Sequence, residues 1–218
     1  MAAPVRNWLR EITGISPGEE VDSGVGVADF IAGNACREDV ARRLAKCQPV
    51  TDSLHLALLQ RAEKPVCESA LREWAPWGWR GLRTRAVEPL LANGLLHLDQ
   101  DGHYVASRQP CDVFRSIIAI ELKLRDWRRG LAQASRYRLF SEQSYLALPS
   151  SRVSEMVLAS AVKHRVGVLS LEDSGSVAIA MDAPAASPLQ PARRHMVAEK
   201  LLEAQIAAPS KIAGSTLR

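Results

Sequence analysis

The stretch Ile117–Tyr137, IIAIELKLRDWRRGLAQASRY, decides how the fold is interpreted. Its apolar first part predicts a strand over 117–124, and Asp126 is a suitable cap for a predicted helix that extends to about residue 142. Because side chains alternate along a strand, Glu121 and Lys123 would share one face. A strand that is apolar on both faces belongs inside a sheet, where an unpaired charge is costly. We therefore expect this Glu and Lys either to pair with each other or to project into a cleft at the end of the strand.

Two other polar features accompany this strand. Gln133 and Tyr137 are four positions apart on the predicted helix, so they would face the same side of it. Asp29 lies in the segment GVADFI, inside an apolar strand predicted over 25–32. Taken separately, the first pair suits an ordinary helix surface and Asp29 suits a hydrogen-bonded structural carboxylate.

Taken together, these features resemble the PD-(D/E)xK nuclease superfamily, and in particular its RecB-like branch with a QxxxY motif. That family runs helix, strand, strand with Asp, strand with ExK, helix with QxxxY, strand. The corresponding segments here are Asn7–Thr13, Glu20–Ser23, Val25–Ala32 with Asp29, Ile117–Leu124 with ELK, 126–142 with QASRY, and Tyr145–Leu148. The resemblance implies an α/β fold: a restriction-endonuclease-like core, with a mixed central sheet flanked by helices.

The resemblance also implies a chemistry. Asp29, Glu121 and the main-chain carbonyl of Leu122 would be the ligands of Mg²⁺ or Mn²⁺, which prefer hard oxygen donors. Lys123 would orient or deprotonate the attacking water, and Gln133 and Tyr137 would position DNA or the metal-bound groups. The expected function is that of a metal-dependent DNA endo- or exonuclease in DNA repair, restriction or defence. Glu11, on the first helix, is either an additional ligand or a surface residue.

The match departs from the family in two respects. Asp29 lies far upstream of Glu121, and GVAD is a loose version of the family's Gly-containing Asp motif. The intervening segment would then be an insertion between two core strands, which chains tolerate when the ends of the insertion lie close together. If GVAD is not the true motif, Asp112 is the alternative acid, and the insertion hypothesis fails.

The intervening segment has its own pattern. Helices are expected after a cap at Thr51, Asp52 or Ser53, over 66–74 and over 82–93, with Gly94 at the end. A hairpin is expected from strands 95–98 and 103–106. Over 51–108 this order resembles a winged helix, a family that serves DNA binding or protein contacts. We therefore expect a nuclease-like core over 1–33 and 109–183, an inserted winged-helix module over 34–108, and a tail over 184–218 with a helix over 194–207.

Basic residues form two clusters in a chain of net charge +4 and pI about 9.0. Such a charge permits a polyanionic partner without demanding one. Arginine suits phosphate because its planar fork makes parallel hydrogen bonds. We expect DNA as the partner and leave RNA open, although solvated helix faces would give the same pattern. The clusters are Arg125, Arg128, Arg129, Arg136 and Arg138, and then Arg80, Arg83 and Arg85 beside Trp74, Trp77 and Trp79.

Other features bound the class of protein. The four cysteines match no common zinc spacing, so we expect reduced thiols in a cytoplasmic protein. The segment MAAPVRNWLREITG lacks a long apolar core, so no signal peptide is expected. No apolar run approaches the roughly 18 residues of a membrane span, so no membrane partner is expected. Two other functions stay open, a DNA-binding regulator without catalysis and a protein-interaction adaptor, and so does assembly as a homodimer.

Overall fold

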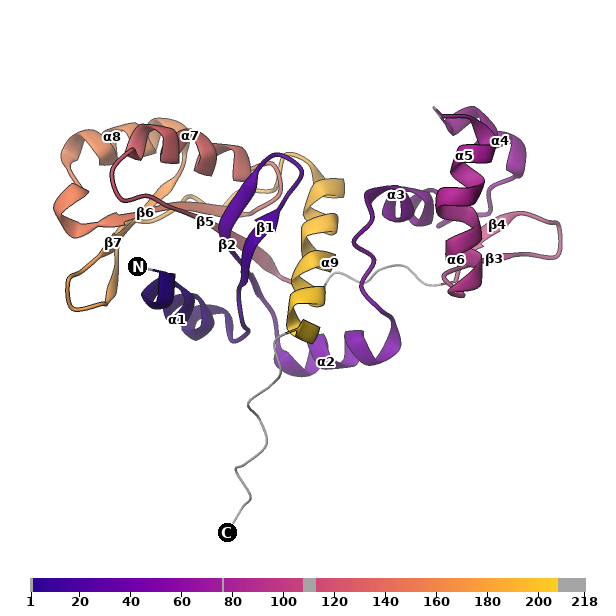
Figure 1. Cartoon of the computed structure of the whole chain (residues 1–218), viewed down its shortest axis with the longest axis horizontal. Coiled ribbons are helices and arrows are strands. Elements are labelled where there is room, and N and C mark those ends of the chain that lie inside the picture. Colours follow the sequence, from indigo (N-terminus) through magenta and orange to yellow (C-terminus); the bar gives the residue numbers. More distant parts are fainter. Residues whose placement is uncertain (1, 76, 108–112, 208–218) are drawn as a thin grey trace, which may run out of the picture. The chain divides into compact units, whose positions relative to one another are not determined.

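The computed structural model describes residues 2–75, 77–107 and 113–207 (Figure 1). It is an α/β structure with a six-stranded mixed sheet flanked by helices. The chain divides into two compact units, Met1–Gln48 with Asp112–Arg218 (unit 1) and Pro49–Cys111 (unit 2). No helix in the described parts of the chain is both long and apolar enough to cross a membrane.

The sheet of unit 1 has the order β1-β2-β5-β6-β7-β8. Its central strands β5, β6 and β7 are parallel, and the outer pairings are antiparallel. β5, β6 and β7 are apolar and almost fully buried, as expected for strands covered on both faces. The strands are β1 Gly18–Asp22, β2 Val27–Asn34, β5 Ser116–Leu122, β6 Gln143–Pro149, β7 Gly167–Leu171 and β8 Val177–Met181.

β2 and β5 are neighbours in the sheet although unit 2 lies between them in the chain. Their antiparallel register runs from Asn34 opposite Ser116 to Phe30 opposite Ile120. The chain therefore leaves the sheet at Asn34 and returns at the residue directly opposite. The start of β5 is thus placed by its pairing with β2, across a long stretch of sequence.

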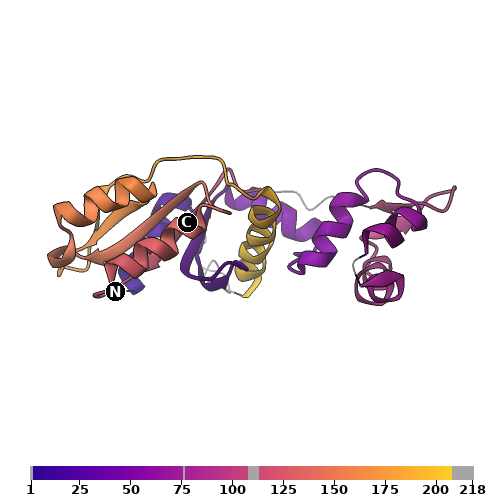
Figure 2. The same ribbon diagram turned by 90° about the horizontal axis from the view of Figure 1, so that it is seen from above.

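Helices cover both faces of this sheet (Figures 1 and 2). α1, Ala2–Thr13, packs Val5 and Leu9 on one face against a core that includes Ile118 and Ile120. α7 (Trp127–Tyr137), α8 (Glu155–His164) and α9 (Pro191–Ala207) lie on the other face. Ile117 belongs to the core on this second side, so the predicted alternation along β5 is confirmed. A short 3₁₀ turn, Ser150–Arg152, precedes α8.

α9 belongs to the core of unit 1. The sequence predicted a helix over 194–207 in a tail, and the structure begins this helix at Pro191. Its residues Val197, Ala198, Leu201 and Leu202 are buried beside residues of β2 and β5. α2, Arg37–Lys46, also belongs to unit 1, whereas the prediction assigned all of 34–108 to the inserted module.

Unit 2 contains helical segments followed by a hairpin. Asp52 caps α3 by accepting the backbone N–H groups of Leu54 and His55. Gly94 follows the last helix with a φ of +65°, the left-handed conformation that favours glycine. The elements are α3 Ser53–Arg61, α4 Glu68–Trp74, α5 Gly78–Leu82, a π-helical segment Arg83–Val87, α6 Glu88–Ala92, β3 Leu96–Leu98 and β4 Tyr104–Ala106.

The π-helical segment has a covalent cause that the sequence analysis did not identify. Pro89 follows this segment and has no N–H for the carbonyl four positions earlier, at Arg85. The structure satisfies that carbonyl from another helix, since His55 Nε2 lies 2.8 Å from the Arg85 oxygen and must be the donor. The predicted helix over 82–93 is therefore part of a helical stretch that begins at Gly78 and widens before the proline.

Candidate functional site

Asp29 and Glu121 lie side by side where β2 meets β5. The register places Phe30 opposite Ile120, so the next position along each strand carries Asp29 and Glu121. The Leu122 N–H donates a hydrogen bond to Asp29 Oδ2 at 2.7 Å, across 93 positions of sequence. Opposed residues of an antiparallel pair share one face of the sheet. The structure thus brings together the two acids that the sequence analysis predicted as metal ligands.

Glu121 is a buried carboxylate with two polar partners. Its side chain is 1% exposed, and Lys123 Nζ lies 2.6 Å from its Oε1. Its Oε2 accepts a hydrogen bond from the hydroxyl of Tyr137, which also lies 2.9 Å from the Val27 carbonyl oxygen. Lys123 is 25% exposed, so its ammonium reaches the border between this cluster and solvent. The Glu–Lys pair expected from the sequence is therefore present, with the lysine as its outer member.

The hydroxyl of Tyr137 is held in its neutral form. Burial raises the pKa of Tyr137 far above its usual value, and the hydrogen bond to Glu121 and the charges of Glu121 and Asp29 raise it further. A neutral hydroxyl has a proton to donate, whereas a phenolate would repel the two carboxylates. Tyr137 therefore fixes the orientation of the Glu121 carboxylate as a hydrogen-bond donor.

Gln133 is placed by the packing of α7 on the sheet. A Cβ added at Gly130 would lie 2.7 Å from Lys123 Cγ, so the helix backbone rests directly on that side chain. One turn on, Gln133 lies between this contact and Tyr137. Its amide oxygen Oε1 is buried and has no hydrogen-bond partner among the described residues. A buried oxygen without a donor is rare in native structures and marks a place where a bound group would be stabilised.

The chemistry of these donors fits a hard divalent cation. Two carboxylates and a spare amide oxygen are the kinds of ligand that Mg²⁺ and Mn²⁺ take. The oxygens of Glu121 are engaged by Lys123 and Tyr137, but each carboxylate oxygen has two lone pairs and can accept a second partner. A cation beside Glu121 would compete with the ammonium for the same negative charge.

The structure does not bring Glu11, a possible additional ligand, to this cluster. Glu11 is exposed on α1, which covers the opposite face of the sheet. Asp112, the alternative to Asp29, lies outside the described residues.

The arginines predicted around the site in unit 1 are solvent-facing. Arg125, Arg128, Arg129 and Arg136 are exposed, and none makes an ion pair with an acid in the described part of the chain. Arg128 stacks on the ring of Trp127 with its Cζ 4.4 Å from the centroid. Arg138, also in this predicted cluster, is half-buried.

The arginines predicted in unit 2 have different partners. Arg83 pairs with Glu88 at 3.0 Å, and Arg80 is exposed without an acid partner among the residues described. Arg85 lies over the ring of Trp77, its Cζ 5.6 Å from the centroid. Trp77 is 60% exposed, whereas Trp74 and Trp79 are half-buried. Of these three indoles, that of Trp77 is the most exposed to solvent.

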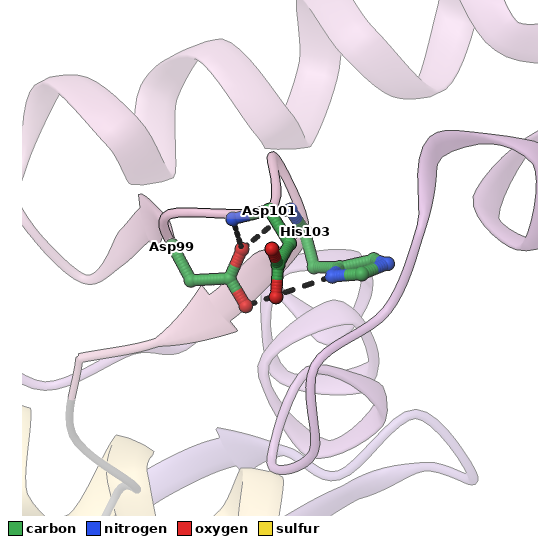
Figure 3. Close-up of side chains that lie close together, drawn as sticks. All are labelled: Asp99, Asp101 and His103. Carbon is green, nitrogen blue, oxygen red and sulfur yellow. Dashed lines mark hydrogen bonds and ion pairs between the residues drawn. The ribbon is translucent and has the colours of Figure 1, made fainter.

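The sequence analysis missed a compact group in the turn between β3 and β4 (Figure 3). Asp99 Oδ1 accepts the N–H groups of Asp101 at 3.0 Å and His103 at 2.8 Å, and these bonds lower the pKa of Asp99. The side chains of Asp99, Asp101 and His103 offer potential ligand atoms within 4.8 Å of one another. The hydrogen bonds of Asp99 account for the cluster as a brace of the turn, a role that an Asp opening a DQDGH segment suggests.

The cysteines carry no cross-link among the described residues. Cys36, Cys47 and Cys67 are free thiols, and Cys111 lies outside the described residues.

Comparison with known proteins gives no match to a family model, to a curated protein or to a solved structure. The resemblance to the PD-(D/E)xK nucleases therefore stays a prediction made from the residues themselves. What the protein does has to be inferred from the arrangement of its own side chains.

Proposed function

We propose that this protein is a metal-dependent DNA nuclease with a PD-(D/E)xK core of the RecB-like kind. One observation carries the proposal: Asp29 and Glu121 meet on neighbouring strands, with Lys123 2.6 Å from Glu121. Two acids that could hold a cation, with a lysine beside them, suit metal-assisted hydrolysis of a phosphodiester. Tyr137 and Gln133, on the helix that follows, complete the expected set.

The architecture of both units supports this proposal. In unit 1, a mixed sheet flanked by α1 on one face and α7 on the other suits a restriction-endonuclease-like core. In unit 2, helical segments precede the β3–β4 hairpin, and Val66 makes an isolated bridge to Tyr104 of that hairpin. A strand contact between the first helices and the hairpin is what a winged helix would have. We propose that unit 2 is a winged-helix-like DNA-binding module inserted between β2 and β5.

In the proposed mechanism, Asp29, Glu121 and the carbonyl of Leu122 would hold Mg²⁺ or Mn²⁺. The bound cation would acidify a water molecule and neutralise charge on the scissile phosphate. Lys123, at the solvent border of the cluster, donates hydrogen bonds to the attacking water and to the phosphoryl oxygens. Tyr137 keeps Glu121 oriented, and Gln133 offers its spare amide oxygen to a donor on the substrate or on bound water.

The exposed arginines supply the proposed DNA contacts. Arg125, Arg128, Arg129 and Arg136 are without acid partners in the described residues, which leaves their guanidinium groups available for phosphate. Arg80, Arg83 and Arg85 would contact DNA from unit 2. We propose DNA as the substrate, with RNA as the alternative, a cytoplasmic location, and a homodimer where both strands are cut.

A cleavage assay tests the proposal. Plasmid and linear DNA are incubated with the protein and Mg²⁺ or Mn²⁺, beside the variants Asp29→Asn, Glu121→Gln and Lys123→Ala. Glu11→Gln and Lys163→Ala are matched controls, since both residues are exposed and lie outside the cluster. We expect cleavage in the wild type and the controls, and its loss in EDTA and in all three site variants. Cleavage that persists in Glu121→Gln would overturn the proposal.

A second function is favoured by one feature of the same site. Both oxygens of Glu121 are already engaged by Lys123 and Tyr137, so the cluster also works as a closed structural network. A non-catalytic DNA-binding regulator with a nuclease-like fold would have such a network. It would bind DNA in a gel-shift assay at about 50 mM salt, where phosphate contacts are strong, without cleaving it.

A further inference from the structure

Unit 2 contains an apolar hollow of about 280 Å³. Its wall from α3 consists of Ser53, Leu54 and Ala57, and Leu82 at the end of α5 is fully buried beneath it. The remaining wall is aromatic, formed by Trp74 and Trp77. Among the described residues of the lining, Ser53 alone has a hydroxyl and the rest are aliphatic or indole side chains, so the hollow suits a flat, largely apolar group.

The more exposed of the two indoles is held in place by a tight turn. The Gly78 N–H bonds to the Ala75 carbonyl oxygen at 3.1 Å, and Gly78 has a φ of +78°, which a residue with a side chain rarely adopts. Trp77, just before this glycine, is left 60% exposed beside the hollow. A large aromatic ring kept in solvent by the backbone is a stacking surface for another ring.

Two arginines stand at these indoles without acid partners. Arg61 Cζ lies 5.8 Å from the ring centroid of Trp74, and Arg85 Cζ lies 5.6 Å from that of Trp77. Neither makes an ion pair with an acid in the part of the chain that the structure describes. Elsewhere in the unit, Arg72 pairs with Glu68 and Arg83 pairs with Glu88. Two of the arginines of unit 2 that have no acid partner among the described residues therefore lie beside the two indoles of the hollow, and Arg80 is a third such arginine.

A hydrogen bond from His55 connects two of the elements around the hollow. His55 follows Leu54 on α3 and bonds to the carbonyl of Arg85, so the α3 wall is tied to the residue that carries one of the arginines. Arg85 lies in the π-helical segment, and such segments occur frequently at functional sites. The α3 wall of the hollow and the backbone at Arg85 are thus linked within unit 2.

From these contacts we infer that the hollow binds an unpaired base of single-stranded DNA, with Trp77 stacking on the base and Arg61 and Arg85 binding the flanking phosphates. The apolar lining suits the ring, and the two arginines suit an anion beside it, which an apolar peptide segment does not supply. A base in a duplex is already stacked on both faces and would have to leave its neighbours to enter. The inference rests on the proposed function for its choice of DNA, and it adds that single strands or frayed ends are preferred.

Binding measurements on the full-length protein test this inference. Fluorescence anisotropy of a labelled oligothymidylate and of a blunt duplex is followed in EDTA, so that cleavage plays no part. Stacking is worth about 1–3 kcal/mol per base, so Trp77→Ala should weaken single-strand binding by about 10-fold and change duplex binding much less. Trp77→Phe, which keeps a ring, should recover part of the affinity. Arg85→Gln should lower the salt dependence of single-strand binding, because one phosphate contact is lost.

Arg72→Gln is the matched control, since Arg72 also lies over an indole, Trp79, but is paired with Glu68 and does not line the hollow. We expect its single-strand affinity to match that of the wild type. Equal single-strand affinity for the wild type and Trp77→Ala, both folded by circular dichroism, would overturn the inference, and so would tighter binding of an apolar peptide or of the matching RNA. Cleavage that persists in Glu121→Gln, with the Trp77 effect intact, would leave the hollow as a single-strand site and remove only the nuclease proposal.

Discussion

A single buried carboxylate illustrates how the candidate site is stabilised at the scale of residues. Removing a carboxylate from water is costly unless charge and hydrogen bonds replace the lost hydration. Glu121 receives both, from Lys123 on its own strand and from Tyr137 on α7. Because Lys123 is the more exposed partner, it is the member that a bound cation could displace at the lowest cost.

Lys123→Ala should therefore show whether a cation binds here without reference to catalysis. In EDTA the variant should lose about 2–3 kcal/mol of unfolding free energy, because Glu121 is left buried without its counter-charge. Mn²⁺ should restore much of this loss, since a ligand at 100 times its Kd adds about 2.7 kcal/mol. Urea unfolding with and without Mn²⁺ measures both effects. A variant that Mn²⁺ does not stabilise would contradict the assignment of Asp29 and Glu121 as metal ligands.

Tyr145 gives a prediction for alkaline pH. Burial raises the pKa of its hydroxyl, so the folded state keeps the proton that the unfolded chain releases near pH 10. The stability that depends on this proton is complete below that pH and is lost as the pH rises above it. Tyr145→Phe should lower the unfolding free energy by about 1 kcal/mol at pH 7, because the hydrogen bond from Gln143 is lost. Above pH 10, the unfolding free energy of this variant should fall less steeply with pH than that of the wild type. Urea unfolding measures this at several pH values, and equal slopes of unfolding free energy against pH for the wild type and the variant would refute the prediction.

At the scale of elements, α7 approaches the sheet closely only because residue 130 has no side chain. A Cβ at Gly130 would lie 2.6 Å from Leu146 Cδ1 and 2.7 Å from Lys123 Cγ, both well inside van der Waals contact. The helix therefore could not rest on Lys123 with any larger residue at this position. This glycine connects the packing of α7 to the geometry of the site.

Gly130→Ala should destabilise the protein by about 1–3 kcal/mol, because overpacking outweighs the better helix propensity of alanine. Lys123 would have to move, so Mn²⁺ binding should weaken as well. Gly81→Ala in α5 is the matched control, since its Cβ would meet Trp77 Cβ at an ordinary 3.5 Å. The unfolding free energy of that variant should rise by up to about 1 kcal/mol. Thermal unfolding compares the two, and a stabilised Gly130→Ala would show that α7 does not press on the sheet.

Local signals in the sequence predicted many of these elements. The apolar run around ELK predicted β5, Asp52 was among the caps expected for α3, and Gly94 ends the helix before the predicted hairpin. Such features are encoded by neighbouring residues, so a single sequence is sufficient to find them. The pairing of Asp29 with Glu121 was reached only through a family resemblance, because nothing local specifies which distant strand lies beside β5.

Other features depended on partners that the sequence does not reveal. Pro89 suggests a break, but the π-helical segment persists because His55 on another helix satisfies the Arg85 carbonyl. α9 has little amphipathic pattern around its start, and its place in the core is set by β2 and β5 residues far upstream. Asp99 accepts hydrogen bonds from backbone N–H groups of its own turn. An Asp at the start of the segment DQDGH is a local signal for such a turn, although the sequence analysis predicted no role for it.

At the scale of the molecule, a buried ion pair joins the last helix to the first part of the chain. Arg43 on α2 lies 2.9 Å from Glu199 on α9, and both side chains are almost fully buried. Arg43→Met should lower the unfolding free energy by about 3–5 kcal/mol, because removing one member of a buried pair leaves the other charged group in the interior. The double variant Arg43→Met/Glu199→Leu should recover much of this loss. Urea unfolding of all three proteins checks the prediction, which fails if the double variant is the least stable.

The register between β2 and β5 predicts that unit 1 tolerates the deletion of unit 2. Asn34 and Ser116 are direct partners, so the segment between them begins and ends at one place in the sheet. Replacing residues 49–111 by a short Gly/Ser linker should leave unit 1 folded, since loop closure depends only weakly on loop length. The shortened protein should unfold cooperatively in urea and keep its response to Mn²⁺, while oligothymidylate binding should fall as it does in Trp77→Ala. If deletion abolished cooperative unfolding, the pairing of β2 with β5 would depend on unit 2, and this segment could not be an independent insertion.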